Sequence, residues 1–280
     1  MHALCNAYAV DGRVTWHAPE ARGHATMNTY VVREGDDALI IDTGVALHTV
    51  ALLEQIATLV APATRLAVVH TRIGEYTTIS NTVPIAERFG CSRIHSEQDD
   101  SPRWVDFLAG HGRDRAGPDP FADTTIERYV APDAIAVDPG GHRVLDVFHA
   151  TLRLLPTSWL FDHRSGTLFS SDVFSHVLRA GAGGPWKVTD PDDADATVAL
   201  MRRHLLSTRY WWLAGARLDE IRESIASTFA RYDVETIAPG FGCIRAGAAV
   251  VRRAAAGLDQ ILAEAAAMAP VPMASALANP

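Results

Sequence analysis

The sequence predicts an α/β protein, an αββα sandwich in which helices cover the outer faces of two packed β-sheets. In both halves of the chain, short apolar segments with the two-residue period of strands alternate with segments of helical periodicity. No linker or low-complexity stretch separates the halves. We therefore expect residues 1–266 to form a single domain, and we expect the Ala/Pro-rich tail, residues 267–280, to be flexible.

The first half of the chain is expected to supply one sheet and its helices. Asp11-Gly12 and the Gly35 region carry turn chemistry between apolar segments. Gly90 is expected to end one helix, and Ser101-Pro102 has the N-cap and first-turn chemistry that opens another. Strands are predicted over residues 4–10, 14–17, 28–33, 38–41, 66–69 and 93–95, and helices over residues 50–59, 82–89 and 101–108.

The second half is expected to begin with strands and to end with helices. The acidic residues 189–196 are expected to cap the next helix and to place favourable negative charge in its first turn. The glycine-rich residues 181–186 lack the Lys-Ser/Thr of a phosphate loop, so we expect a mobile loop there. Strands are predicted over residues 127–130, 134–137, 143–148, 158–161, 167–170 and 236–238, and helices over residues 194–206, 218–232 and 247–266.

Composition excludes several classes of partner. The net charge of −8 at pH 7 argues against binding to nucleic acid or to an anionic membrane surface. No apolar run approaches the length of a membrane span, and the N-terminal residues do not read as a signal peptide. The chain has only three cysteines, too few and too scattered for a disulfide framework or a thiolate zinc site. We therefore expect a cytoplasmic location.

Several segments resemble one known family. The stretch GHATMNTYVVREGDDALIIDTG is similar to the opening of the metallo-β-lactamase superfamily, in which an Asp-Thr-Gly-like turn ends the second hairpin strand. VTWHAP, LLPTSWLFDHRSGTLFSSDVFSH and ETIAPGFGCIR narrow the resemblance to the β-lactamase-like domain of flavodiiron and related oxygen-binding diiron proteins. The resemblance spans residues 13–255 and implies the αββα fold of that superfamily. Because flavodiiron proteins form head-to-tail dimers, it also leaves a homodimer open.

The metal site of that family is poorly matched. Flavodiiron proteins carry a His-x-Glu-x-Asp motif after a buried strand, and this chain matches its first position with His70. Arg72 stands at the second ligand position, and Gly74 replaces the aspartate. Glu75 falls on the position that a final histidine occupies elsewhere in the superfamily. A guanidinium cannot be deprotonated in a protein, so Arg72 cannot bind a metal.

The later ligand positions show the same loss. Asp172 matches the bridging aspartate, whereas Leu154 and Phe241 occupy positions where the resemblance implies histidines. Two or three ligands cannot hold a dinuclear centre. We therefore expect no bound cofactor, and we expect Arg72 to replace the metal charge beside Asp172 and Glu75. The predicted catalytic candidates are His70, Arg72, Glu75 and Asp172, and the predicted cavity-lining residues are Tyr76, His149, Leu154, His176 and Phe241.

Three functions remain open, and the sequence does not decide whether the chain is an enzyme. The first is a metal-free protein that binds a small molecule in the former active-site cavity, with acid/base chemistry available from an imidazole and carboxylates. The second is a metal-dependent hydrolase or flavodiiron-like oxidoreductase with iron or zinc on His70, Glu75 and Asp172. The third is a non-catalytic interaction protein. We favour the first.

Overall fold

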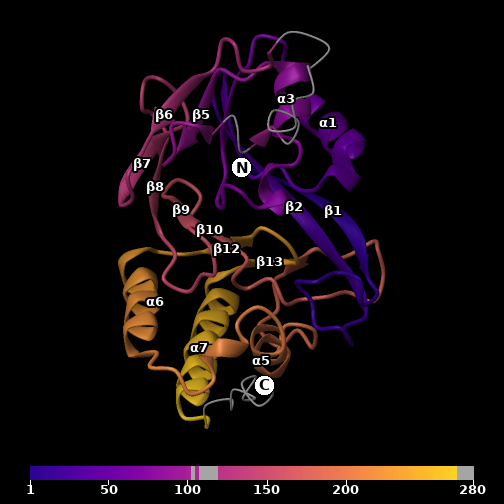
Figure 1. Ribbon diagram of the computed structural model, residues 1–280, viewed down its shortest axis with the longest axis vertical. Coiled ribbons are helices and arrows are strands. Elements are labelled where there is room, and N and C mark those ends of the chain that lie inside the picture. The colour runs from indigo at the N-terminus through magenta and orange to yellow at the C-terminus, as the bar shows by residue number, and fades with distance from the viewer. Residues whose placement is uncertain (102–104, 107–118, 270–280) are drawn as a thin grey trace, which may run out of the picture.

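The computed structural model describes residues 1–101, 105–106 and 119–269. Figure 1 shows two β-sheets between two groups of helices, which confirms the predicted α/β sandwich. Most of the helix predicted over residues 101–108 lies outside the described residues, as do residues 270–280 of the predicted tail. Within the described ranges, no helix is both long enough and apolar enough to cross a bilayer.

The first sheet follows the order of the chain. Its first three strands are antiparallel neighbours, and the next three are added in parallel. The strands are His2–Val10 (β1), Gly23–Glu34 (β2), Asp37–Ile41 (β3), Arg65–Val69 (β4), Arg93–Ser96 (β5) and Thr125–Arg128 (β6). The accompanying helices are Thr49–Ala57 (α1), Tyr76–Ile79 (α2) and Thr82–Phe89 (α3), with a short 3-10 helix at Ala46–His48 (η1).

The second sheet has the order β11-β13-β12-β10-β9-β8-β7, and its centre pairs β10 with β12 in parallel. Its strands are Asp133–Ala136 (β7), Val144–His149 (β8), Ser158–Asp162 (β9), Thr167–Ser171 (β10), Lys187–Val188 (β11), Thr236–Pro239 (β12) and Ile244–Ala246 (β13). Its helices are Val198–Leu206 (α5), Asp219–Arg231 (α6) and Ala248–Ala266 (α7), with a 3-10 helix at Trp211–Leu213 (η3).

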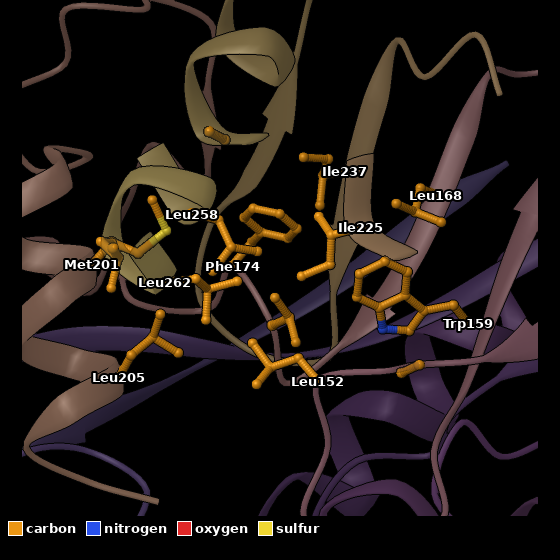
Figure 2. Close-up of a cluster of buried hydrophobic side chains, with 14 of the residues drawn as sticks. Leu152, Trp159, Leu168, Phe174, Met201, Leu205, Ile225, Ile237, Leu258 and Leu262 are labelled. Carbon is orange, nitrogen blue, oxygen red and sulfur yellow. The ribbon is translucent and has the colours of Figure 1, made fainter. Parts of the chain in front are cut away.

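Alternation along the strands builds three apolar layers. In β3, Ile40 faces α1 and α3, whereas Leu39 and Ile41 face the second sheet, as the two-residue period of a strand requires. The third layer lies between the second sheet and helices α5, α6 and α7. Figure 2 shows Trp159 and Leu168 from the sheet side of this layer, facing helix residues that include Leu258. Each sheet therefore buries both faces, and the functional side chains have to lie beyond the ends of the strands.

Three sequence predictions need correction. Residues 14–17 form a turn segment and no strand, because β1 and β2 stop pairing at Val10 and Gly23 and the chain between them turns toward the site. Helix α5 begins at Val198, four residues later than predicted, with Thr197 as its N-cap. The acidic stretch does not cap it, because Asp193 and Asp195 instead bind Arg179. The short elements α2, β11 and β13 were not predicted.

Candidate functional site

The site lies where the carboxyl ends of β3, β4 and β10 meet. Thr71, just after β4, joins them: its backbone N–H donates to Asp42 Oδ1 (2.7 Å), and its Oγ1 lies 2.7 Å from Asp42 Oδ2 and 3.0 Å from Ser171 Oγ. Asp42 and Ser171 have positive φ angles of 56° and 53°, which are unfavourable for non-glycine residues. Strained backbone of this kind concentrates at functional sites. Burial raises the pKa of Asp42 to about 6.

A buried ion pair joins two of the predicted catalytic candidates. Arg72 Nη1 donates to Asp172 Oδ2 (3.2 Å), and both side chains are at most 3% exposed. Tyr210 Oη donates to the same carboxylate oxygen (3.0 Å), and Arg72 Nη2 donates to Thr77 Oγ1 (3.2 Å). Burial alone would lower the pKa of Arg72, but nearby carboxylates, Asp172 first, raise it overall. The guanidinium is therefore charged, which is the arrangement that charge replacement requires.

Glu75 and His70 are held by other partners. Arg209 Nη2 donates to Glu75 Oε1 (2.7 Å), which connects the loop after β4 to the segment that carries Tyr210. His70 Nε2 lies 2.8 Å from Thr82 Oγ1, at the start of α3. Because Thr82 donates its hydrogen to the Ile79 carbonyl (2.9 Å), it accepts from His70 Nε2–H. Burial lowers the pKa of His70 to about 3, so this imidazole is neutral.

The residues predicted to line one cavity are spread over different surroundings. Phe241 is buried against the rings of Trp16 and His17, and Tyr76 is half exposed beside Trp16. His176 is buried and accepts from Arg245. Phe241 and Tyr76 therefore share Trp16 as a neighbour, whereas His176 is held by Arg245.

Two of the predicted cavity residues point elsewhere. Leu154 is 40% exposed, because the loop after β8 is closed at its base by Ala150 N–H donating to the Thr157 carbonyl (2.9 Å) and its tip projects outward. His149 is also exposed and lies 3.5 Å from Glu97. The predicted residues also line two different cavities. His70 lines a small cavity of about 20 Å³, and His176 lines a larger one.

The donor set does not fit a dinuclear metal centre. Asp172 Oδ2 accepts from Arg72 and Tyr210, Glu75 binds Arg209, and His70 uses Nε2 toward Thr82. Across the described ranges, no three histidine, cysteine or carboxylate side chains are grouped so that they could hold a metal ion. A cation bound to Asp172 would also lie against the fixed charge of Arg72, which is unfavourable in a buried site.

The larger cavity was not predicted from the sequence. It measures about 280 Å³ and lies between the turn segment after β1, the loop after β10 and helix α5. The imidazoles of His17, His176 and His204 line it together with Arg22, Arg179 and Arg203. The ring of Phe241 packs against His17 and His204, with centroids 5.7 Å and 6.3 Å apart. Phe241 therefore forms part of the structure that supports this cavity.

No protein-family model and no curated protein match the sequence. Solved structures do match the fold. Rubredoxin oxygen:oxidoreductase from Desulfovibrio gigas is 16% identical with a TM-score of 0.64, over 92% of this chain and 60% of its own. The flavodiiron protein from Giardia intestinalis is 15% identical with a TM-score of 0.64, over 94% of this chain and 60% of its own.

A shorter structure matches over nearly its whole length. The fragment 1–254 of diflavin flavoprotein A 5 from Nostoc sp. is 16% identical with a TM-score of 0.58, over 93% of this chain and 97% of its own. This chain thus spans about three fifths of the two longer proteins. The chain has the metallo-β-lactamase-type fold that forms the β-lactamase-like domain of flavodiiron proteins. At this level of identity, the likeness establishes the fold and leaves function to the site.

Proposed function

We propose that this protein uses the metallo-β-lactamase fold without a resident metal, and that it binds a small molecule in the 280 Å³ cavity beside the former metal site. The observation that carries the first part is the buried Arg72–Asp172 pair, which sits where the resemblance places a bridging aspartate. The guanidinium supplies positive charge that the metals of the related domains would supply. Oδ2 of the carboxylate already accepts from this guanidinium and from Tyr210.

The cavity supports the second part of the proposal. Its volume is near the lower end of the range of about 300–1,000 Å³ that is typical of small-molecule sites. Three imidazoles and three guanidinium groups line it, so it can offer several hydrogen bonds to one bound molecule. Its lining includes His176, four residues after Asp172 in the chain, and the rings of His17 and His204, which pack against Phe241.

Binding is better supported than acid/base catalysis. Burial lowers the pKa of His17 to about 3 and that of His204 to about 4. A general base works best when its pKa lies near the working pH, so these imidazoles are weak bases at neutral pH. Asp172 and Glu75, the carboxylates that the sequence suggested for proton transfer, are each held by an arginine.

Metal content tests the first part. Protein purified without chelator or added metal is expected to contain well under one iron or zinc per chain, and its melting temperature is expected to stay unchanged in EDTA. Elemental analysis and a thermal melt measure these quantities. Stoichiometric metal that survives dialysis and disappears in the Asp172→Ala variant would instead support a hydrolase or oxidoreductase with metal on His70, Glu75 and Asp172.

Blocking the cavity tests the second part. Leu200 lines the cavity from α5, whereas its exposed neighbour Ala199 does not. A compound that binds the cavity at one hundred times its Kd should stabilise the wild type by about 2.7 kcal/mol. We expect Leu200→Trp to abolish this stabilisation and Ala199→Trp to preserve it in a thermal-shift measurement. Equal stabilisation of both variants would place the compound outside the cavity.

A further inference from the structure

A chain of hydrogen bonds runs from Trp16 through Tyr8 to His17. Trp16 Nε1 donates to Tyr8 Oη (3.0 Å), and Tyr8 Oη lies 3.0 Å from His17 Nε2. The rings also pack, since the Tyr8 and Trp16 centroids are 6.0 Å apart in an edge-on arrangement. The three side chains come from the end of β1 and the turn segment that follows it, so local chain geometry fixes their relative positions.

The directions of these hydrogen bonds follow from donor chemistry. An indole N–H can only donate, so Tyr8 Oη accepts from Trp16. The Tyr8 hydroxyl has one hydrogen, and among the described residues its remaining partner is His17 Nε2. If His17 Nε2 carried a hydrogen, the buried phenol hydrogen would be left without an acceptor, which is costly. Tyr8 therefore donates to His17 Nε2, and the imidazole carries its hydrogen on Nδ1.

The surroundings of His17 show what this hydrogen can do. His17 is 3% exposed and lines the 280 Å³ cavity. Its Nε2 lone pair is used by Tyr8, so His17 has a donor to offer there and no free lone pair for a metal ion. Burial lowers its pKa to about 3, which agrees with a neutral ring.

The charges around the cavity favour a negative ligand. Arg179 is already bound by Asp193 and Asp195. Arg203, by contrast, lines the cavity from α5 and has no ion pair among the described residues. Arg22 also lines the cavity, and within the described part of the chain its guanidinium donates only to the backbone carbonyls of Pro19 and Ala21. The lining carries three guanidinium groups against two carboxylates, Glu20 and Asp195. The buried guanidinium of Arg245, which donates to His176, offsets the charge of Asp193 behind Arg179, so the surroundings of the cavity carry a net positive charge.

We infer that Trp16 and Tyr8 hold His17 as the neutral Nδ1–H tautomer, and that the cavity takes an oxyanion group, a carboxylate or a phosphate, between His17 Nδ1–H and Arg203. This assignment rests on the proposed function for the use of the cavity, but the tautomer is independent of it. Tyr8 and Trp16 are positioning residues that act through His17. A cation would meet a donor edge and an unpaired guanidinium, so the same arrangement excludes it.

The tautomer is tested by an NMR spectrum that correlates the ring nitrogens and hydrogens of 15N-labelled histidine in the free protein. His17 is expected to show the hydrogen on Nδ1. Tyr8→Phe removes the donor to Nε2 and should shift His17 toward the Nε2–H form. Tyr76→Phe is the matched control, because Tyr76 touches Trp16 and has no hydrogen bond to His17. An Nε2–H pattern in the wild type, or an unchanged pattern in Tyr8→Phe, would overturn the assignment.

The ligand class is tested by titrating inorganic phosphate and acetate against potassium chloride of equal ionic strength. Saturable binding of either oxyanion is expected, and Arg203→Gln should weaken it by about tenfold because a charge-assisted hydrogen bond is lost. Arg202→Gln, on the same helix outside the cavity lining, should leave it unchanged.

The outcomes separate the two levels of the proposal. If neither oxyanion binds, the oxyanion assignment is overturned. A neutral or cationic compound blocked by Leu200→Trp would then keep the proposed function. If no compound binds at the cavity but His17 shows the Nδ1–H tautomer, the proposed function is refuted. The hydrogen bond from Tyr8 to His17 then still stands.

Discussion

Replacing Arg72 by alanine is expected to lower the melting temperature by about 10 °C. The change leaves Asp172 buried with a charge that is only partly satisfied by Tyr210. Breaking a buried ion pair typically costs about 3–5 kcal/mol, and for a chain of this size each kcal/mol shifts the melting temperature by about 2–4 °C. Thermal unfolding monitored by circular dichroism measures the effect.

A double variant separates charge from packing. If uncompensated charge causes the loss, Arg72→Ala combined with Asp172→Asn should recover part of it, because the asparagine carries no charge. Arg222→Ala is the matched control, since Arg222 binds Asp259 with both side chains partly exposed. Exposed pairs contribute little, so its melting temperature should barely move. A neutral Arg72→Ala variant, or losses that simply add in the double variant, would show that Arg72 compensates nothing.

Acid is expected to unfold the protein sharply near pH 5. The structure buries several histidines in neutral form. Burial lowers the pKa of four of them to about 3 or 4. It lowers the pKa of the fifth, His176, well below 6.5. They are the buried His17, His70, His95 and His176 and the half-buried His204.

The sign of the effect follows from proton linkage. The unfolded chain takes up protons at these histidines near pH 6.5 and the folded chain does not, so their stabilising contribution is complete above that pH and is lost as pH falls. Together, the five histidines lower the free energy of unfolding by about 7 kcal/mol for each unit that the pH falls below about 6. Burial raises the pKa of Asp42 to about 6. Asp42 therefore acts in the opposite direction and offsets the contribution of about one of the five histidines. The remainder is comparable to the whole stability of a domain, about 5–15 kcal/mol.

Denaturant titrations between pH 7.5 and pH 5 measure this slope directly. His95→Gln should reduce the slope by about one proton, because His95 is 4% exposed. His163→Gln, at a side chain that is 59% exposed, should leave the slope unchanged. A stability that does not depend on pH in this range would mean that the folded protein protonates these rings, and hence that they are better solvated than the structure shows.

The sequence predicted those elements whose signals are local. Helix α3 has the predicted bounds, Thr82–Phe89, because Gly90 ends it with a φ of 73° that glycine adopts readily. Strand β3 was predicted from its apolar run. Strand β13, by contrast, is three residues long and lies between β12 and β11, the latter more than fifty residues earlier in the chain. Such a strand carries no pattern of its own.

The site was predictable only in part, for a related reason. Arg72 and Asp172 could be placed together because a family resemblance assigns both to one metal site, although one hundred residues separate them. His17, Arg179 and His204 form the cavity from three separate elements, and no spacing in the sequence relates them. His17 was further hidden because its segment looked like a strand. Only the mutual packing of the Trp16, His17 and Phe241 rings shows that this segment turns into the site.

The Arg72–Asp172 pair has a consequence for how the protein matures. A metal ion must be delivered from a cellular pool, and its occupancy follows the free concentration of that ion and competition from other metals. A guanidinium carried on the same chain arrives with synthesis, cannot dissociate, and is present at every chain in equal stoichiometry. Under the proposed function, the electrostatic completion of this site is therefore independent of metal supply, of chelators and of the order in which metals and chain meet.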